Sequence, residues 1–203
     1  YGVPAFLGLQ DGSITGTDGS VLESDLDSGS NPTGNGDILA GTFGAIAAPK
    51  GLVGISVEGV DISAAELTNS SGTPITVPTD HGVLKINGYD AVTGMVSYTY
   101  TLLTPADHSG GAAVDAIDLS ITDNEGNVGT AIMRVAILND LPQAADDAAM
   151  VTEDGPTTAS GNVVTANDVI GADKPVGTAP LVTGIVAGTG IPTGNVGVPI
   201  NGI

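Results

Sequence analysis

The sequence predicts an all-β protein built of tandem antiparallel β-sandwiches, the second of them incomplete. Three observations carry this prediction. Apolar residues alternate with small polar ones over several stretches that are rich in β-branched and aromatic types. These stretches recur at roughly ten-residue spacing between glycine-rich turns, which is typical of sandwiches. An Asn-Asp-Leu-Pro junction at residues 139–142 then divides the chain, and the sequence after it is too short for a second complete sandwich.

Within the first part of the chain, strands are predicted wherever the alternation holds. They cover residues 52–57, 82–86, 95–103, 116–122 and 130–138. Along the last three strands one parity of residue is expected to face the core. The expected core positions are Tyr98, Tyr100, Leu102, Ile117, Leu119, Ile121, Ile132, Val135 and Ile137.

One turn and one helix have specific signatures. Residues 123–127 read Asp-Asn-Glu-Gly-Asn, which predicts a hairpin turn with Gly126 at positive φ. Ser63 and Glu66 have the spacing of a capping box, in which each side chain accepts a hydrogen bond from the other residue's backbone. The apolar run after Ser63 is short, so the box predicts a helix of no more than a turn or two.

Composition and texture suggest three parts in the chain. Residues 1–19 are predicted to be a strand and linker that belongs to or completes an adjacent domain. Residues 20–143 form the first sandwich. Residues 144–203 form part of a second one, because no aromatic residue occurs there and a complete sandwich needs roughly a hundred residues. Strands are expected in this last part at 163–165, 181–186 and 194–203.

The charge excludes some classes of protein. The chain has 23 acidic and four basic residues, and the four are widely scattered, which argues against nucleic-acid binding. No stretch is long and apolar enough to span a membrane. The absence of cysteine excludes a disulfide scaffold. The chain has no cationic leader and starts without Met, so a mature form or an excerpt is expected. Divalent cations would neutralise the acidity, although acidity also provides plain solubility.

Acidic and amide side chains cluster in four places and are candidate calcium ligands, since calcium takes about six to eight oxygens. One cluster lies in residues 22–27 and one spans the junction at 139–147. Another, with Asp107, Asp123 and Glu125, is expected near one pole of the first sandwich, and the last begins at Glu153. The predicted ligands are Glu23, Asp25, Asp107, Asp123, Asn139, Asp140, Asp146, Asp147 and Glu153. Each of them has a structural alternative, because Asp and Asn are also ordinary turn residues.

No pattern indicates catalysis. His81 and His108 are the only histidines, and without thiols they are too few for a typical zinc site. Asp107, His108 and Ser109 are adjacent on a turn and cannot face one another as a catalytic triad. Phosphate-binding glycine loops are absent from the sequence. The chain is therefore not expected to be an enzyme.

Several motifs, taken in order, resemble a known family. Asp-His-Ser-Gly-Gly at 107–111, the run 115–127 and Ile-Leu-Asn-Asp-Leu-Pro at 137–142 resemble the end of a bacterial cadherin-like or Ig-like repeat. Such repeats occur in giant RTX-type adhesins that are exported by type I secretion. Residues 144–155 and 161–168 resemble the opening of a VCBS-type repeat.

The resemblance covers most of residues 20–190. Residues 163–166 match the family's usual run loosely, and the Asp-Gly-x-Tyr-x-Tyr hairpin that completes a VCBS repeat is missing. The resemblance implies an array of sandwiches on the bacterial surface, calcium at the domain junctions and no catalysis. It also implies that Glu23 and Glu153 contribute the ligand that lies near the first strand of each repeat.

The two ends of the sequence suggest how copies are joined. Residues 201–203 followed by residues 1–4 would form one continuous strand. We therefore expect residues 1–9 to pair with residues 144–203 of a neighbouring copy, by β-strand addition or as the next repeat of a polyprotein. The alternative is that they fold back inside their own chain.

Two functions remain. The first is a structural repeat of an extracellular adhesin or filament, a calcium-stiffened spacer for surface attachment or biofilm formation, assembled head-to-tail. The second is a sandwich that binds a carbohydrate or another ligand. Sugar platforms usually need exposed aromatic residues, and Tyr1 and Tyr89 are the only candidates, so the spacer is favoured.

Overall fold

The computed structural model of the chain describes residues 3–9, 18–47, 49–143, 154–155 and 171–172. The chain divides into two units, Tyr1–Asp140 and Leu141–Ile203, close to the boundary predicted at residue 143. All helices and strands described below belong to the first unit. The partial second sandwich predicted for residues 144–203, with its three strands, lies outside the described residues.

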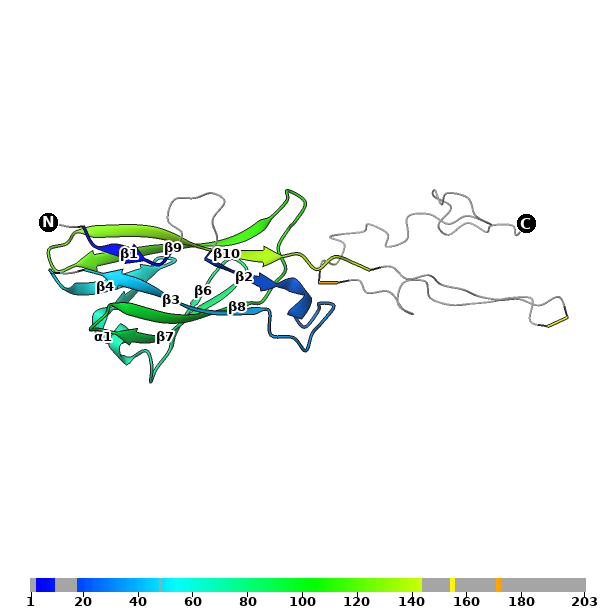
Figure 1. The fold of residues 1–203 in the computed structure, drawn as a ribbon, viewed down its shortest axis with the longest axis horizontal. Coiled ribbons are helices and arrows are strands. Elements are labelled where there is room, and N and C mark those ends of the chain that lie inside the picture. Colours follow the sequence, from blue (N-terminus) through cyan, green and yellow to red (C-terminus); the bar gives the residue numbers. More distant parts are fainter. Residues whose placement is uncertain (1–2, 10–17, 48, 144–153, 156–170, 173–203) are drawn as a thin grey trace. The chain divides into compact units, whose positions relative to one another are not determined.

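In the described part, the first unit consists of two five-stranded sheets and one short α-helix (Figure 1). The first sheet has the order β1 (Ala5–Leu7), β3 (Ile38–Ile46), β8 (Met95–Leu102), β7 (Gly82–Asp90) and β6 (Ile75–Pro78). The second has the order β2 (Gly19–Leu22), β10 (Val128–Leu138), β9 (Ala113–Asp123), β4 (Leu52–Val57) and β5 (Val60–Ser63). Neighbouring strands are antiparallel except β2 and β10, which are parallel.

The local signals in the sequence are confirmed. The five strands predicted from alternation are β4, β7, β8, β9 and β10. The helix α1 (Ala64–Asn69) begins with the predicted capping box, in which Glu66 N–H donates to Ser63 Oγ at 3.3 Å and Ser63 N–H donates to Glu66 Oε2 at 2.8 Å. Gly126 adopts φ of +81° in the hairpin turn.

The core lies between the sheets, and its predicted parity is confirmed with one exception. Eight of the nine expected core residues are buried, but Ile132 is 38% exposed. Its neighbour Met133 is fully buried instead. The reason is the two-residue period of β10, on which the buried Val135 and Ile137 define the inward parity and Ile132 has the opposite one.

The N-terminal strand corrects a prediction. β1 pairs with β3 of its own chain, with Ala5 opposite Ile46, and the ring of Phe6 packs edge-on against Phe43 at 5.7 Å. The Pro4 carbonyl occupies the place where a side chain at position 129 would stand, so only glycine fits there. The expectation that residues 1–9 pair with a neighbouring copy is therefore wrong for this strand. The assignment of residues 1–19 to an adjacent domain stays a prediction, although β1 and Gly19 of β2 pair within the unit.

The chain enters and leaves this unit at opposite ends. Pro4 and β1 lie beside Gly129, at the start of β10. The unit ends beyond Leu138, at the other end of the same strand. With eleven residues, β10 is about 33 Å long. We call the end with the β7–β8 and β9–β10 turns the entry pole, and the end where β10 stops the exit pole.

Candidate functional site

A buried carboxylate organises the exit pole. Glu23 opens the 3-10 helix Glu23–Asp25, directly after β2, and its side chain is fully buried. Its Oε1 accepts hydrogen bonds from the Ala106 N–H at 2.7 Å and from His108 Nε2 at 3.0 Å. Its Oε2 accepts from the Asp140 N–H at 3.3 Å. One side chain thus joins the segment after β2, the loop before β9 and the end of the unit.

Two further carboxylates at the exit pole accept several hydrogen bonds each. Asp140 accepts hydrogen bonds from the Ser30 N–H at 2.8 Å and the Ser30 hydroxyl at 2.6 Å. Asp25 accepts from the Gly36 N–H at 2.6 Å and from Ser24 and Asn31, both at 2.9 Å. The Gly36 N–H, with smaller contributions from the two side chains, lowers the pKa of Asp25 against the opposing effect of burial.

The other predicted ligands are placed differently. Asp107 and Asn139 are exposed at the exit pole, and the Ser109 N–H donates to Asp107 at 2.8 Å and lowers its pKa. Asp107 precedes β9 whereas Asp123 ends it, so the expected grouping of Asp107 with Asp123 and Glu125 at one pole is wrong. The predictions for Asp146, Asp147 and Glu153 lie outside the described residues.

Asp123 has the structural role of a turn residue at the entry pole. It accepts hydrogen bonds from the N–H groups of Glu125 at 2.9 Å and Asn127 at 2.8 Å, and from the Asn127 side chain at 2.8 Å. The Asn127 side chain is the largest cause of its lowered pKa. Lys50 forms an ion pair with Glu125 across the same turn. These bonds fix the β9–β10 turn and leave the carboxylate of Asp123 directed into it.

The described residues do not form a calcium shell by themselves. Among them, no group of three or more His, Asp or Glu side chains has the arrangement of a metal site. A carboxylate has about four lone-pair positions, and Glu23 and Asp25 each use three of them for protein donors. The calcium ligand set therefore stays a prediction, which depends on residues beyond the described part.

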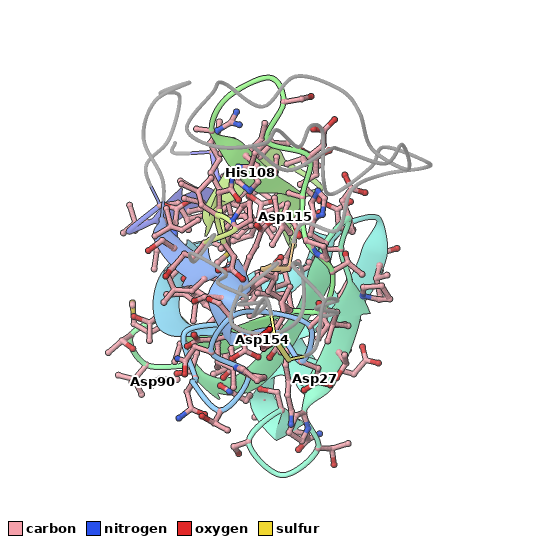
Figure 2. All side chains as sticks on the ribbon, turned by 90° about the vertical axis from the view of Figure 1, so that its right-hand side faces the viewer. Asp27, Asp90, His108, Asp115 and Asp154 are labelled. Atoms are coloured by element: carbon pink, nitrogen blue, oxygen red, sulfur yellow. The ribbon has the colours of Figure 1, made fainter. Side chains whose placement is uncertain are left out.

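Another buried carboxylate, which the sequence analysis missed, lies between the sheets. Asp115 Oδ2 accepts hydrogen bonds from the Tyr100 hydroxyl at 2.6 Å, the Thr79 hydroxyl at 2.7 Å and the His81 N–H at 3.1 Å. Its Oδ1 is buried without a partner in the described part. Figure 2 labels Asp115 on β9 and His108 in the preceding loop. Alternation along the strand could have predicted this burial, because Asp115 lies on the same face of β9 as Ile117, Leu119 and Ile121.

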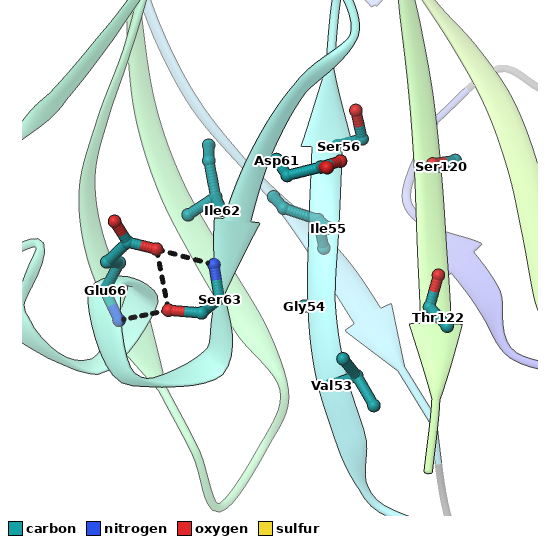
Figure 3. A pocket seen from close by; sticks show the side chains of 10 residues that line it. All are labelled: Val53, Gly54, Ile55, Ser56, Asp61, Ile62, Ser63, Glu66, Ser120 and Thr122. Carbon is teal, nitrogen blue, oxygen red and sulfur yellow. Dashed lines mark hydrogen bonds between the residues drawn. The ribbon is translucent and has the colours of Figure 1, made fainter. Parts of the chain in front are cut away.

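Two shallow pockets lie away from this network. One, of about 340 Å³, lies along β4, β5 and β9 (Figure 3). Its polar lining consists of Ser56, Asp61, Ser63, Glu66, Ser120 and Thr122. The other, of about 380 Å³, lies at the entry pole between the end of β3, the start of β4 and the β7–β8 turn, and Tyr89 lines it. Burial, followed by the charge of Asp90, raises the pKa of Tyr89.

Comparison with models of known protein families, with curated proteins and with solved structures finds no match to this chain. Among the described residues, the structure contains no helix with the length and apolarity needed to cross a membrane.

Proposed function

We propose that the chain is a structural repeat of an extracellular bacterial adhesin or filament. In this proposal each copy is an Ig-like or cadherin-like sandwich that acts as a spacer for surface attachment, joined head-to-tail to further copies. The carrying observation is that the chain enters the first unit beside Gly129 and leaves it beyond Leu138, at opposite ends of β10. Units connected through opposite ends extend with every copy, which is the geometry a spacer needs.

The network at the exit pole supports this proposal. The last residue of the unit, Asp140, is held through its side chain by Ser30 and through its backbone by Glu23. A force applied along the chain beyond Asp140 therefore reaches several segments of the unit rather than β10 alone. Because Glu23 is fully buried, water does not compete for its bond with the Asp140 backbone.

Calcium belongs to the proposal as the agent that stiffens the junction. A chain with net charge −19 repels itself, and the exposed Asp107 and Asn139 lie at the pole from which the linker departs. We propose that these residues, Glu23, Asp25 and Asp140 surround the ion together with Asp146, Asp147 and Glu153 of the linker. Asp123 is not part of this set, because it lies at the other pole.

Thermal unfolding with calcium and with excess EDTA tests this proposal. The melting temperature of the first unit should fall on chelation, because an ion that binds only the folded state stabilises it. The substitution Asp140→Asn should remove most of that difference. Asp61→Asn is a matched control, since it removes the same charge from β5, which lies at the opposite edge of the sheet from β2. A melting curve that EDTA leaves unchanged would contradict the calcium part of the proposal.

A further inference from the structure

The entry-pole pocket has an uncharged lining in a strongly acidic chain. Its lining includes Ile46, Pro49, Leu52, Tyr89 and Val92, and no lining residue is acidic or basic. The whole chain has 23 acidic and four basic residues. Lys50 and Asp90 adjoin the lining but are not part of it. A pocket lined by exposed apolar groups without a charged side chain has the composition of the centre of a contact surface.

A turn fixed by hydrogen bonds presents an almost fully exposed apolar side chain at this pocket. Val92, in the β7–β8 turn, is 95% exposed. Asp90 fixes the turn by accepting hydrogen bonds from the Val92 N–H at 2.9 Å and the Thr93 hydroxyl at 2.8 Å, and Gly94 closes it with φ of +75°. Because the turn is fixed before any partner arrives, little conformational entropy is lost when Val92 is covered.

The sequence contains a segment suited to this surface. Residues 175–203 hold no acidic or basic residue, while all 23 acidic residues precede them, and they are rich in Val and Ile. Most other parts of a second copy would bring carboxylates towards an acidic molecule. An uncharged segment avoids both this repulsion and the cost of burying a charge in an apolar pocket.

We propose that the entry-pole pocket binds residues 175–203 of a second copy of this chain. This inference rests on the proposed head-to-tail arrangement, in which the C-terminal part of one copy comes closest to the entry pole of the next. It replaces the exchange of an N-terminal strand, since β1 is already paired with β3. Val92 and the ring of Tyr89 are the expected anchors on the receiving copy.

Sedimentation equilibrium of the full chain tests the contact. The substitution Val92→Asp should weaken self-association by at least about tenfold, because it places a charge on a surface that must be desolvated. Val53→Asp is the matched control: it adds the same charge at a valine on β4 that is 49% exposed, and should change the association constant by less than about twofold. Both positions are exposed, so neither substitution should prevent folding.

Other outcomes would overturn the inference. Equal weakening by the two substitutions would indicate general charge repulsion. Self-association of a chain lacking residues 175–203 as strong as that of the full chain would exclude the proposed segment. The NMR chemical shifts of residues 89–95 could also stay constant as the protein concentration rises but change when a neutral oligosaccharide is added. That result would mean that the pocket binds a ligand and not a second copy. The calcium dependence of the melting temperature tests the spacer proposal separately. If Val92→Asp still melts at a calcium-dependent temperature, a failure of the present inference leaves the spacer proposal standing.

Discussion

The hydroxyl of Tyr100 donates a 2.6 Å hydrogen bond to Oδ2 of Asp115, and both residues are buried. Tyr100 belongs to β8 in the first sheet and Asp115 to β9 in the second, so this bond joins the sheets inside the core. The same oxygen holds the β6–β7 turn through Thr79 and His81. One buried carboxylate thus fixes three segments relative to one another.

Removal of the Tyr100 hydroxyl should be costly. In Tyr100→Phe the buried Asp115 keeps its donors from Thr79 and His81 but loses the shortest of its three hydrogen bonds. A hydrogen bond to a carboxylate contributes about 1.5–3 kcal/mol. Urea unfolding measures the change in the free energy of unfolding. Tyr89→Phe removes a hydroxyl at the entry pole and is the control. Equal stabilities of the two variants would refute a role of the Tyr100–Asp115 bond in holding the sheets together.

The same pair predicts a loss of stability at alkaline pH. Burial, and then the hydrogen bond and charge of Asp115, raise the pKa of Tyr100 far above the ordinary value of 10.0. The folded state therefore favours the neutral phenol, and this contribution to stability is complete below pH 10 and is lost as the pH rises above it. Melting temperatures at pH 8 to 11 should fall less steeply in Tyr100→Phe than in the unmodified chain. Parallel curves would contradict the predicted shift.

The paired strands β9 and β10 allow a buried isoleucine to be compared with an exposed one. Ile121 is fully buried whereas Ile132 is 38% exposed. Truncating a buried isoleucine to alanine costs about 2–5 kcal/mol, through lost transfer energy and the cavity left behind. Ile121→Ala should show this loss in chemical unfolding, and Ile132→Ala should lose much less. The reverse order would mean that the register of these strands is wrong.

Acid should weaken the exit pole through Asp25. Its pKa is lowered mainly by the Gly36 N–H, so its contribution to stability is present above the unfolded pKa and is lost as the pH falls through the folded value. Melting temperatures between pH 7 and pH 3 should therefore depend less on pH in Asp25→Asn. Several other carboxylates also have lowered pKa values, so the informative quantity is the difference between the two chains. A slope that the substitution leaves unchanged would exclude this contribution.

Local sequence patterns predicted the positions of most strands and of the helix, but not which strands pair with one another. Alternation identified β4 and β7–β10, and the capping box identified α1, because these signals depend on neighbouring residues. The parallel pairing of β2 with β10 joins Leu22 to Leu138, and no local pattern encodes such a contact. β1 was assigned to a neighbouring copy because three residues carry little periodic signal, whereas its partner is fixed by packing against Phe43 and Gly129.

The candidate site was predicted only in part. The spacing of acidic residues led to Glu23, Asp25 and Asp140. Glu23 and Asp140 are joined by a hydrogen bond, whereas Asp25 has separate donors. The sequence does not reveal that the oxygens of these carboxylates accept hydrogen bonds from backbone N–H groups. Such bonds form only when loops that are distant in the sequence fold together. The grouping of Asp123 with Asp107 overlooked the predicted strand at 116–122, which lies between them and carries its two ends to opposite poles. Asp115 was missed because one acidic residue in an apolar strand resembles a solvent-facing position.

Small-angle X-ray scattering of one copy and of two copies in series tests the spacer proposal most directly. With calcium present, the maximum dimension of two copies should be roughly twice that of one, because each copy adds length between opposite poles. Excess EDTA should shorten the average dimension of two copies by allowing the junction to bend. A maximum dimension for two copies that stays close to that of one, with calcium bound, would contradict the account.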